Sequence, residues 1–255
     1  MTKLFEMAEK QADSGLEEIV KRKVISFEDK KALDIGDYYA LTQIFGERPE
    51  LEKKRIVIED ARVVGLDLSD YKLGVLPEAL FELEGLIVLN LNYNGLGELP
   101  KEIGKLSKLR ELYLYKNKIK YFPEEFWGLE NLEKLDLKGN GIRELPKGIG
   151  HLKKLVELDL SHNKYLNLPE EFWGLENLEK LDLSFNELGE LPREIGNLRK
   201  LRELYLWGNK IKYLPWSIRK LRNLTYLNLR DNHIGRLHRL LLRIMLPLSC
   251  RILVR

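Results

Sequence analysis

The chain has 255 residues, of which 44% are hydrophobic and 33% charged, enough to bury a substantial core in one large domain or two small ones. No apolar run approaches the roughly 18 residues of a membrane-spanning helix, and the N-terminal residues lack the apolar stretch of a secretory signal. The single cysteine, Cys250, cannot form an internal disulfide. Together these features predict a cytoplasmic protein, and the abundance of Lys and Glu with only two Gln is typical of thermophile proteins.

The net charge of +3 is unevenly distributed along the chain. Residues 236–255 contain five arginines and no acid. Subtracting these five charges leaves residues 1–235 at −2, so the body is slightly acidic and the C-terminal segment is basic.

Residues 1–62 contain no unit of the repeat that follows them. The pattern predicts two helices and one strand, over residues 2–23, 26–45 and 55–59. Ser26 is the expected N-cap of the second helix and Gly46 its stop, and the strand is expected to turn at Asp60 and Ala61. We interpret the segment as a helical N-terminal cap over the open end of a core. A separate functional domain is the alternative, although about 60 residues form a marginal core.

A 23-residue repeat occupies residues 63–246. Its eight units begin with Leu or Val, at positions 63, 86, 109, 132, 155, 178, 201 and 224. Each unit follows the frame LxxLxLxxNxLxxLPxxIxxLxx without insertion. One unit is too small to bury its own apolar residues, so the units are expected to stack, with their LxL segments forming one parallel sheet.

Two polar features of the frame have structural explanations. Asn recurs at positions 94, 117, 140, 163, 186, 209 and 232. Its amide can satisfy backbone groups exposed where each strand leaves the sheet. Proline recurs seven times on the returning segment, where a missing N–H does no harm. Tyr71 replaces the asparagine in the first unit and His238 the proline in the last.

This frame resembles the leucine-rich repeat family. Its LPxxI half is similar to the intracellular repeats of Ras-suppressor, Scribble-like and plant intracellular Ras-group proteins. The resemblance implies an α/β fold, a leucine-rich repeat solenoid or horseshoe with its parallel sheet on the concave face. It also implies a scaffold for protein–protein interaction.

The sequence Glu-Phe-Trp-Gly occurs twice, ending at Gly128 and Gly174. At the Trp position, large and small residues alternate along the units: Phe81, Gly104, Trp127, Gly150, Trp173 and Gly196. This alternation predicts a 46-residue superrepeat in which each ring packs over the glycine of the neighbouring unit on the convex side.

The C-terminal segment, residues 236–255, is expected to begin with a helix. Its apolar residues fall at helical spacing: Leu237, Leu240, Leu241, Ile244 and Leu248. The favoured interpretation is a cap that closes the solenoid with this face, and residues 247–255 form the remaining tail. A basic amphipathic helix that binds a membrane or a partner is one alternative, and a disordered or non-native extension is another.

The sequence offers no catalytic apparatus. It has no phosphate-binding glycine loop and no nucleophile motif, and its four histidines lie at unrelated repeat positions. His162 is interpreted as a solvated turn residue. We therefore expect neither an enzyme nor a bound cofactor or metal.

The concave face holds the candidate site, because residues that alternate with the buried leucines point outward. Asp136, Asp159 and Asp182 are expected to form an acidic row between aromatic residues on both sides. Those aromatic residues are Tyr93, Tyr113, Tyr115, Phe185, Tyr205 and Trp207. Glu and Lys alternate at the preceding offset and predict weak ion pairs between strands.

Exposed Tyr and Trp are typical of binding hot spots, and like charges at strand spacing repel each other unless a cation offsets them. The leading hypothesis is therefore a scaffold that binds a protein or peptide with a basic, partly apolar surface on its concave face. The alternative is an anionic membrane or nucleic-acid binder that uses the arginine-rich tail. The repeat frame is also compatible with an acidic row that has no binding role. The sequence does not define an oligomeric state.

Overall fold

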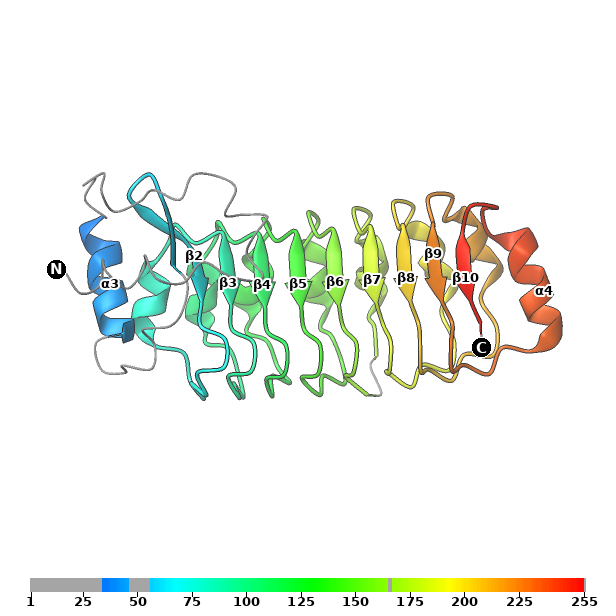
Figure 1. The fold of residues 1–255 in the computed structure, drawn as a ribbon, viewed down its shortest axis with the longest axis horizontal. Helices are drawn as coiled ribbons and strands as arrows, with labels where there is room; N and C mark the ends of the chain where they lie inside the picture. The colour runs from blue at the N-terminus through cyan, green and yellow to red at the C-terminus, as the bar shows by residue number, and fades with distance from the viewer. Residues whose placement is uncertain (1–33, 46–55, 165–166, 255) are drawn as a thin grey trace.

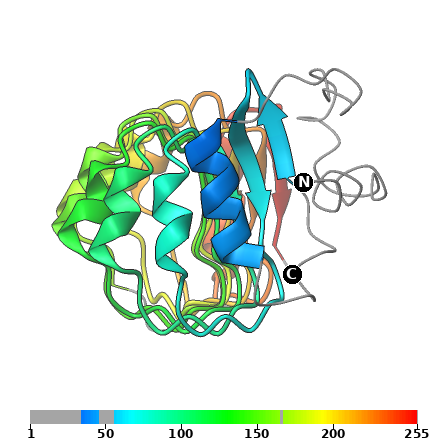
Figure 2. The same ribbon diagram turned by 90° about the vertical axis from the view of Figure 1, so that its left-hand side faces the viewer.

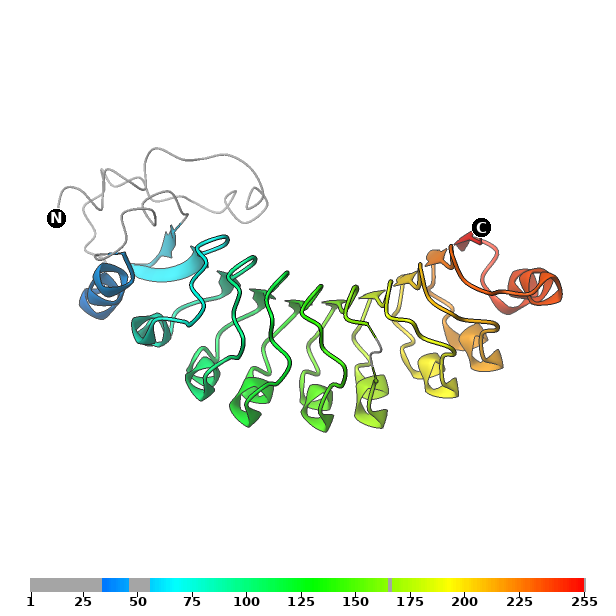
Figure 3. The ribbon, with the colours of Figure 1, turned by 90° about the horizontal axis from the view of Figure 1, so that it is seen from below.

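The computed structural model describes residues 34–45, 56–164 and 167–254, which form an elongated solenoid (Figure 1). Each repeat adds one short strand to a single sheet and one 3₁₀ helix to the opposite side. Figure 3 shows the strands along the inner side of the arc and the 3₁₀ helices fanned along the outer side. Viewed from its N-terminal end, the successive units superpose closely (Figure 2). Within the described ranges, no helix combines the length and apolar character that crossing a membrane requires.

The sheet has ten strands in chain order: β1 Ile56–Glu59, β2 Arg62–Asp67, β3 Val88–Asn90, β4 Glu111–Tyr113, β5 Lys134–Asp136, β6 Glu157–Asp159, β7 Lys180–Asp182, β8 Glu203–Tyr205, β9 Tyr226–Asn228 and β10 Arg251–Leu253. The 3₁₀ helices are η2 Glu78–Glu82, η3 Lys101–Lys105, η4 Glu124–Gly128, η5 Lys147–His151, η6 Glu170–Gly174, η7 Arg193–Asn197 and η8 Trp216–Lys220. Two α-helices flank them, α3 Ile35–Phe45 and α4 Arg236–Met245. β1 pairs with β2 antiparallel, and all later pairs are parallel. The expected repeat solenoid and its parallel sheet are confirmed.

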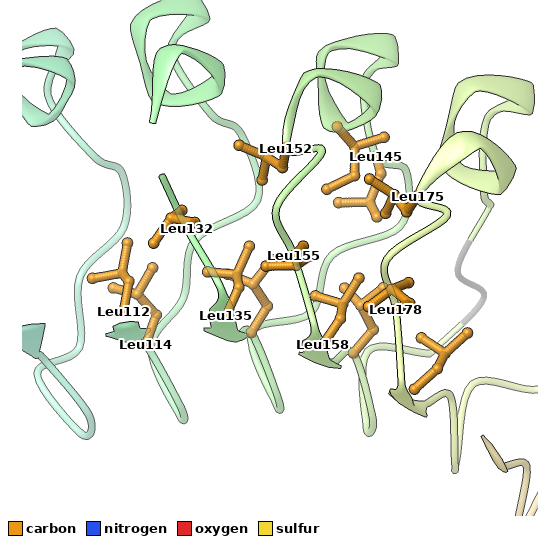
Figure 4. Close-up of a cluster of buried hydrophobic side chains, with 14 of the residues drawn as sticks. Leu112, Leu114, Leu132, Leu135, Leu145, Leu152, Leu155, Leu158, Leu175 and Leu178 are labelled. Atoms are coloured by element: carbon orange, nitrogen blue, oxygen red, sulfur yellow. The ribbon is translucent and has the colours of Figure 1, made fainter. Parts of the chain in front are cut away.

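The repeated leucines form a continuous core between the sheet and the 3₁₀ helices (Figure 4). Neighbouring strands pair in a register of 23 residues, so Leu112 lies beside Leu135 and Leu135 beside Leu158. All three are almost completely buried. Because burying one leucine contributes about 1.5–3 kcal/mol, stacking equivalent residues makes each unit depend on its neighbours.

The buried asparagines form the expected ladder at the strand exits. In a typical unit, the Asn140 side-chain amide donates to Leu114 O at 2.9 Å and to Leu137 O at 3.0 Å. Its Oδ1 accepts the N–H of Ile119 at 3.2 Å. The asparagine thus satisfies backbone groups at its strand exit, as the sequence predicted, and it also joins its own strand to the preceding unit.

The convex side has a 46-residue superrepeat, but its packing differs from the expectation. The Trp127 ring lies against Gly148, not Gly150. Gly150 instead faces the next 3₁₀ helix, where an added Cβ would lie 2.9 Å from Cβ and 3.1 Å from O of Glu171. Gly104 meets Glu125 in the same way. Glycine therefore allows alternate pairs of 3₁₀ helices to approach closely, which is why η5 packs more tightly on η6 than on η4.

At the N-terminal end, α3 packs Ala40, Leu41 and Ile44 into the core. The helix begins at Ile35, so the expected start at Ser26 is wrong for this helix. The reason is local: Asp34 Oδ1 accepts the N–H groups of Gly36 and Asp37 and caps the helix there. The helix expected over residues 2–23 lies outside the described residues, and the helical cap as a whole stays a prediction.

A buried carboxylate joins α3 to the sheet. Asp37 is fully buried, accepts the N–H of Val63 at 2.7 Å and pairs with Arg62 at 3.0 Å. The turn between β1 and β2 lies at Asp60 and Ala61, as expected, and both residues have positive φ.

At the C-terminal end, α4 covers the core with Leu242, Met245 and Leu246. Four of the five residues expected to form its packing face are exposed: Leu237, Leu240, Ile244 and Leu248. The expected packing face is therefore wrong, although the helix is present. After α4 the chain returns to the sheet as β10, where Ile252 pairs with Leu227 at a 25-residue offset.

Candidate functional site on the concave face

Five of the candidate residues form one straight row across the sheet. The pairing register places Tyr113, Asp136, Asp159, Asp182 and Tyr205 side by side on β4 to β8. They alternate with buried leucines along their strands and are half-buried on the concave side. We call these five residues the central row. It places three like charges on adjacent strands about 5 Å apart, with a tyrosine at each end.

The three aspartates also have a structural task that the sequence analysis missed. Each carboxylate accepts the backbone N–H two residues later, at Lys138, Ser161 and Ser184, with distances of 2.8–2.9 Å. Asn90 and Asn228 accept the same bond at the same repeat position. The sequence could have predicted this hydrogen bond, because Asp or Asn recurs at the last residue of the strand and short polar side chains commonly close turns.

Electrostatic repulsion and burial act together on the row. The pKa of Asp136 is raised to about 6, mainly by burial and also by the charges of Asp159 and Asp182. The hydrogen bond from Lys138 N and the Lys138 charge act in the opposite direction. Burial also raises the pKa of Asp182. A cationic group placed over the row would favour the ionised carboxylates and so gain binding energy from them.

The tyrosines at the two ends of the row have matching environments. The Tyr113 hydroxyl donates to Glu111 Oε2 at 2.6 Å, and the Tyr205 hydroxyl donates to Glu203 Oε2 at 2.8 Å. Burial and these carboxylates raise the pKa of both phenols. Tyr205 also packs on Tyr226, with ring centroids 5.1 Å apart. Both rings are thereby held in place before any partner binds.

The expected ladder of ion pairs is present in part. Lys134 lies between Glu111 and Glu157, with Nζ 3.6 Å from a carboxylate oxygen of each. Lys180 forms no such pair with any residue in the described part of the chain. The Glu–Lys contacts therefore support the N-terminal half of the row only.

The remaining candidates form two clusters at the strand exits. In the first, Tyr93 and Tyr115 meet edge to face at 4.9 Å, and the Lys116 ammonium lies 5.3 Å and 5.5 Å from their ring centres. In the second, Phe185 contacts Trp207 at 4.6 Å and stacks on His162 at 4.4 Å. Trp207 Nε1 donates to Asp231 Oδ2 at 2.6 Å. We call these the N-terminal and C-terminal rim clusters.

A row of left-handed residues explains where the rim clusters lie. Tyr93, His162 and Phe185 share one repeat position and have φ of 59°, 60° and 57°. Gly208 takes the same position in the next unit, and the Phe185 ring lies against it. This conformation turns each side chain along the solenoid toward its neighbour. This row was not predicted from the sequence. His162 is an exposed turn residue, as expected, and it also stacks on Phe185.

Other reactive groups lie away from this face. Burial raises the pKa of the Cys250 thiol to about 11, so it stays protonated at neutral pH and is a poor nucleophile. Within residues 34–45, 56–164 and 167–254, no three His, Cys, Asp or Glu side chains gather in a way that could hold a metal ion.

Comparison with known proteins identifies the repeat. Three leucine-rich repeat family models match successive parts of the chain: leucine rich repeat over residues 62–119, leucine-rich repeat region over 101–187, and leucine rich repeats (2 copies) over 176–216 and 199–240. They do not distinguish the Ras-suppressor and Scribble-like subtype, which stays a prediction. A search of curated proteins finds no match.

Similar solved structures come from bacteria and plants. Internalin C2 of Listeria monocytogenes is 26% identical, with a TM-score of 0.63 over 76% of this chain and 81% of its own. The plant peptide hormone receptor RGFR1, solved in complex with RGF2, is 34% identical, with a TM-score of 0.58 over 66% of this chain. A leucine-rich repeat protein of Leptospira interrogans is 31% identical over 74% of this chain, with a TM-score of 0.46.

The chain spans 60% of the Leptospira protein and 28% of the plant receptor. The family models together cover residues 62–240, which include the strands, the asparagine ladder and the central row. The chain therefore belongs to the leucine-rich repeat family, whose repeats are non-enzymatic modules that typically mediate protein–protein interaction.

Proposed function

We propose that this protein is a scaffold that binds a protein or peptide with a basic, partly apolar surface on its concave face. The observation that carries the proposal is the central row, in which three aspartates stand in register between two rigid tyrosines. The row has the charge to attract cationic side chains, and the rings beside it have the apolar area to anchor a partner.

The two rim clusters support the same face. Trp207 and Tyr93 are 40% and 44% exposed, yet their rings are fixed by contacts with Phe185 and Tyr115. A fixed aromatic side chain loses little conformational entropy on binding, which favours its use as an anchor. The clusters lie near opposite ends of the row, so an extended partner crossing β4 to β8 would reach both.

The similarity to RGFR1, a receptor solved in complex with RGF2, supports a peptide or protein as the partner class. The acidic row disfavours nucleic acid on this face, because phosphates would meet carboxylates. The cytoplasmic location expected from the composition remains part of the proposal, and fractionation of cells that express the protein tests it.

A selection of displayed random peptides against the purified chain tests the binding face. We expect the enriched peptides to combine Lys or Arg with apolar residues. Trp207→Ala should lower their affinity about 30-fold, the equivalent of a hot spot of about 2 kcal/mol. The triple change Asp136→Asn, Asp159→Asn and Asp182→Asn should slow association and weaken its salt dependence.

Trp216→Ala is the matched control. Trp216 is more exposed than Trp207 but lies on η8, on the convex side, where it packs on Arg219. Its loss should leave peptide binding unchanged. Enrichment of acidic peptides, or binding that depends on Trp216 and not on Trp207, would refute the concave site.

A further inference from the structure

The open side of α4 is an aliphatic stripe at the C-terminal end of the solenoid. Leu242 and Met245 face the core, but the other side of the helix carries residues spaced three and four apart. These are Leu237, Leu240 and Ile244, which are 73%, 68% and 74% exposed, and they are followed by the fully exposed Leu248. We call these four residues the α4 stripe.

The stripe is held outward by contacts on the packed side of the helix. His238 Nε2 accepts the N–H of Leu214 at 2.8 Å, which ties the first turn of α4 to the last repeat. Leu246 is buried directly after the helix, and the chain then joins β9 as β10. Turning the stripe inward would break these contacts and expose Leu242 and Met245 instead. The molecule therefore presents large aliphatic side chains to its surroundings from a fixed support.

Positive charge surrounds the stripe. Arg236 and Arg243 lie one helical turn from Leu240 and extend α4's positive charge along the edge of the stripe. The adjoining η8 adds Arg219 and Lys220, and neither α4 nor η8 contains an acidic residue. Within the described chain, neither Arg236 nor Arg243 forms an ion pair. These two guanidinium groups are available to an external anion.

We propose that the open face of α4 binds the surface of an anionic lipid membrane. Aliphatic side chains would enter the boundary between headgroups and acyl chains, and the arginines beside them would reach the phosphates. A second copy docked through its own α4 would bring arginines together, because neither helix contains an acidic residue to offset them. A nucleic acid would engage the arginines but leave the aliphatic residues without a partner. The membrane satisfies both features and leaves the concave sheet accessible.

Vesicle flotation with the 255-residue chain tests the proposal. Wild-type protein should bind phosphatidylcholine–phosphatidylserine vesicles, bind them more weakly as salt rises, and bind pure phosphatidylcholine poorly. Leu240→Ser with Ile244→Ser should reduce binding at least about tenfold, because it removes buried aliphatic groups. Arg236→Gln with Arg243→Gln should reduce it by a similar factor and flatten the salt dependence.

Val75→Ser with Tyr121→Ser is the control, because both residues are as exposed as the α4 stripe but lie in other units. This variant should bind vesicles like the wild type. Circular dichroism checks folding, and Leu237→Ser provides a second, milder change if the double serine variant unfolds. Three results would overturn the proposal: no binding to the mixed vesicles, equal binding by the serine variants, or a wild-type dimer that those variants convert to monomer.

Discussion

Replacing Asn140 with alanine tests the ladder that connects the units, and the structure allows its cost to be estimated. The Ile119 N–H loses its acceptor in a buried setting, which costs about 1–3 kcal/mol. Leu114 O and Leu137 O each lose one donor but keep the amide of a neighbouring asparagine. Those two bonds therefore contribute only about 0.5–1 kcal/mol each. We expect Asn140→Ala to lower the free energy of unfolding by about 2–5 kcal/mol.

Urea denaturation followed by circular dichroism measures this change. Asn131→Ala is the matched control, because Asn131 ends the preceding unit and is only partly buried. There its amide donates to Ser107 O and its oxygen accepts from Lys154. Since water can replace both bonds, we expect a loss of no more than about 0.5 kcal/mol. Asn232→Ala, at a partly exposed rung near the C-terminal end, should lie between the two.

Equal losses for Asn140→Ala and Asn131→Ala would show that burial of the amide is not what makes the ladder stabilising. A larger loss at Asn232 than at Asn140 would contradict the argument that water compensates at the end of the solenoid. Either result would refute the reasoning.

Three further predictions follow from single residues. Asp136→Asn should raise the free energy of unfolding at pH 7.5 by about 1–3 kcal/mol but leave it unchanged at pH 4. Because the pKa of Asp136 is raised in the folded state, the wild-type protein loses stability as pH rises through about 6. Thermal melts at both pH values check this. Gly150→Ala should cost about 1–3 kcal/mol in urea denaturation, because its Cβ meets the backbone of Glu171, whereas Gly128→Ala meets nothing within 4 Å and should be neutral. Asp37→Ala should lower the melting temperature by several degrees, since it leaves the buried N–H of Val63 without an acceptor.

The period of the repeat was sufficient to predict the strands, their register and the asparagine ladder. These features depend on which residues are equivalent, and a 23-residue spacing identifies equivalents directly. The packing partner of Trp127 was not predictable in this way. The spacing pointed to Gly150, but the 3₁₀ helices pack in closely spaced pairs and the ring meets Gly148. The spacing of the repeat does not report how closely neighbouring 3₁₀ helices pack.

The same limit applies to α4. Helical spacing identified an apolar stripe, and the sequence analysis assigned that stripe to the core. The helix has a second apolar side, with Leu242 and Met245, and this one is buried. The choice between them depends on contacts outside the helix, such as the bond from Leu214 to His238 and the return of the chain to β10. Such contacts are set by tertiary packing and have no local signature.

For the central row, the structure separates what the fold needs from what binding would need. At this repeat position Asn90 and Asn228 accept the N–H two residues later without carrying a charge, and Tyr113 and Tyr205 replace the acidic residue altogether. The carboxylate of Asp136 accepts the same bond, but it is repelled by the neighbouring aspartates and its charge is partly buried, as its raised pKa shows. The fold therefore does not require the negative charge at this position. A cationic partner would turn that cost into binding energy, and this links the chemistry of the row to the proposed function.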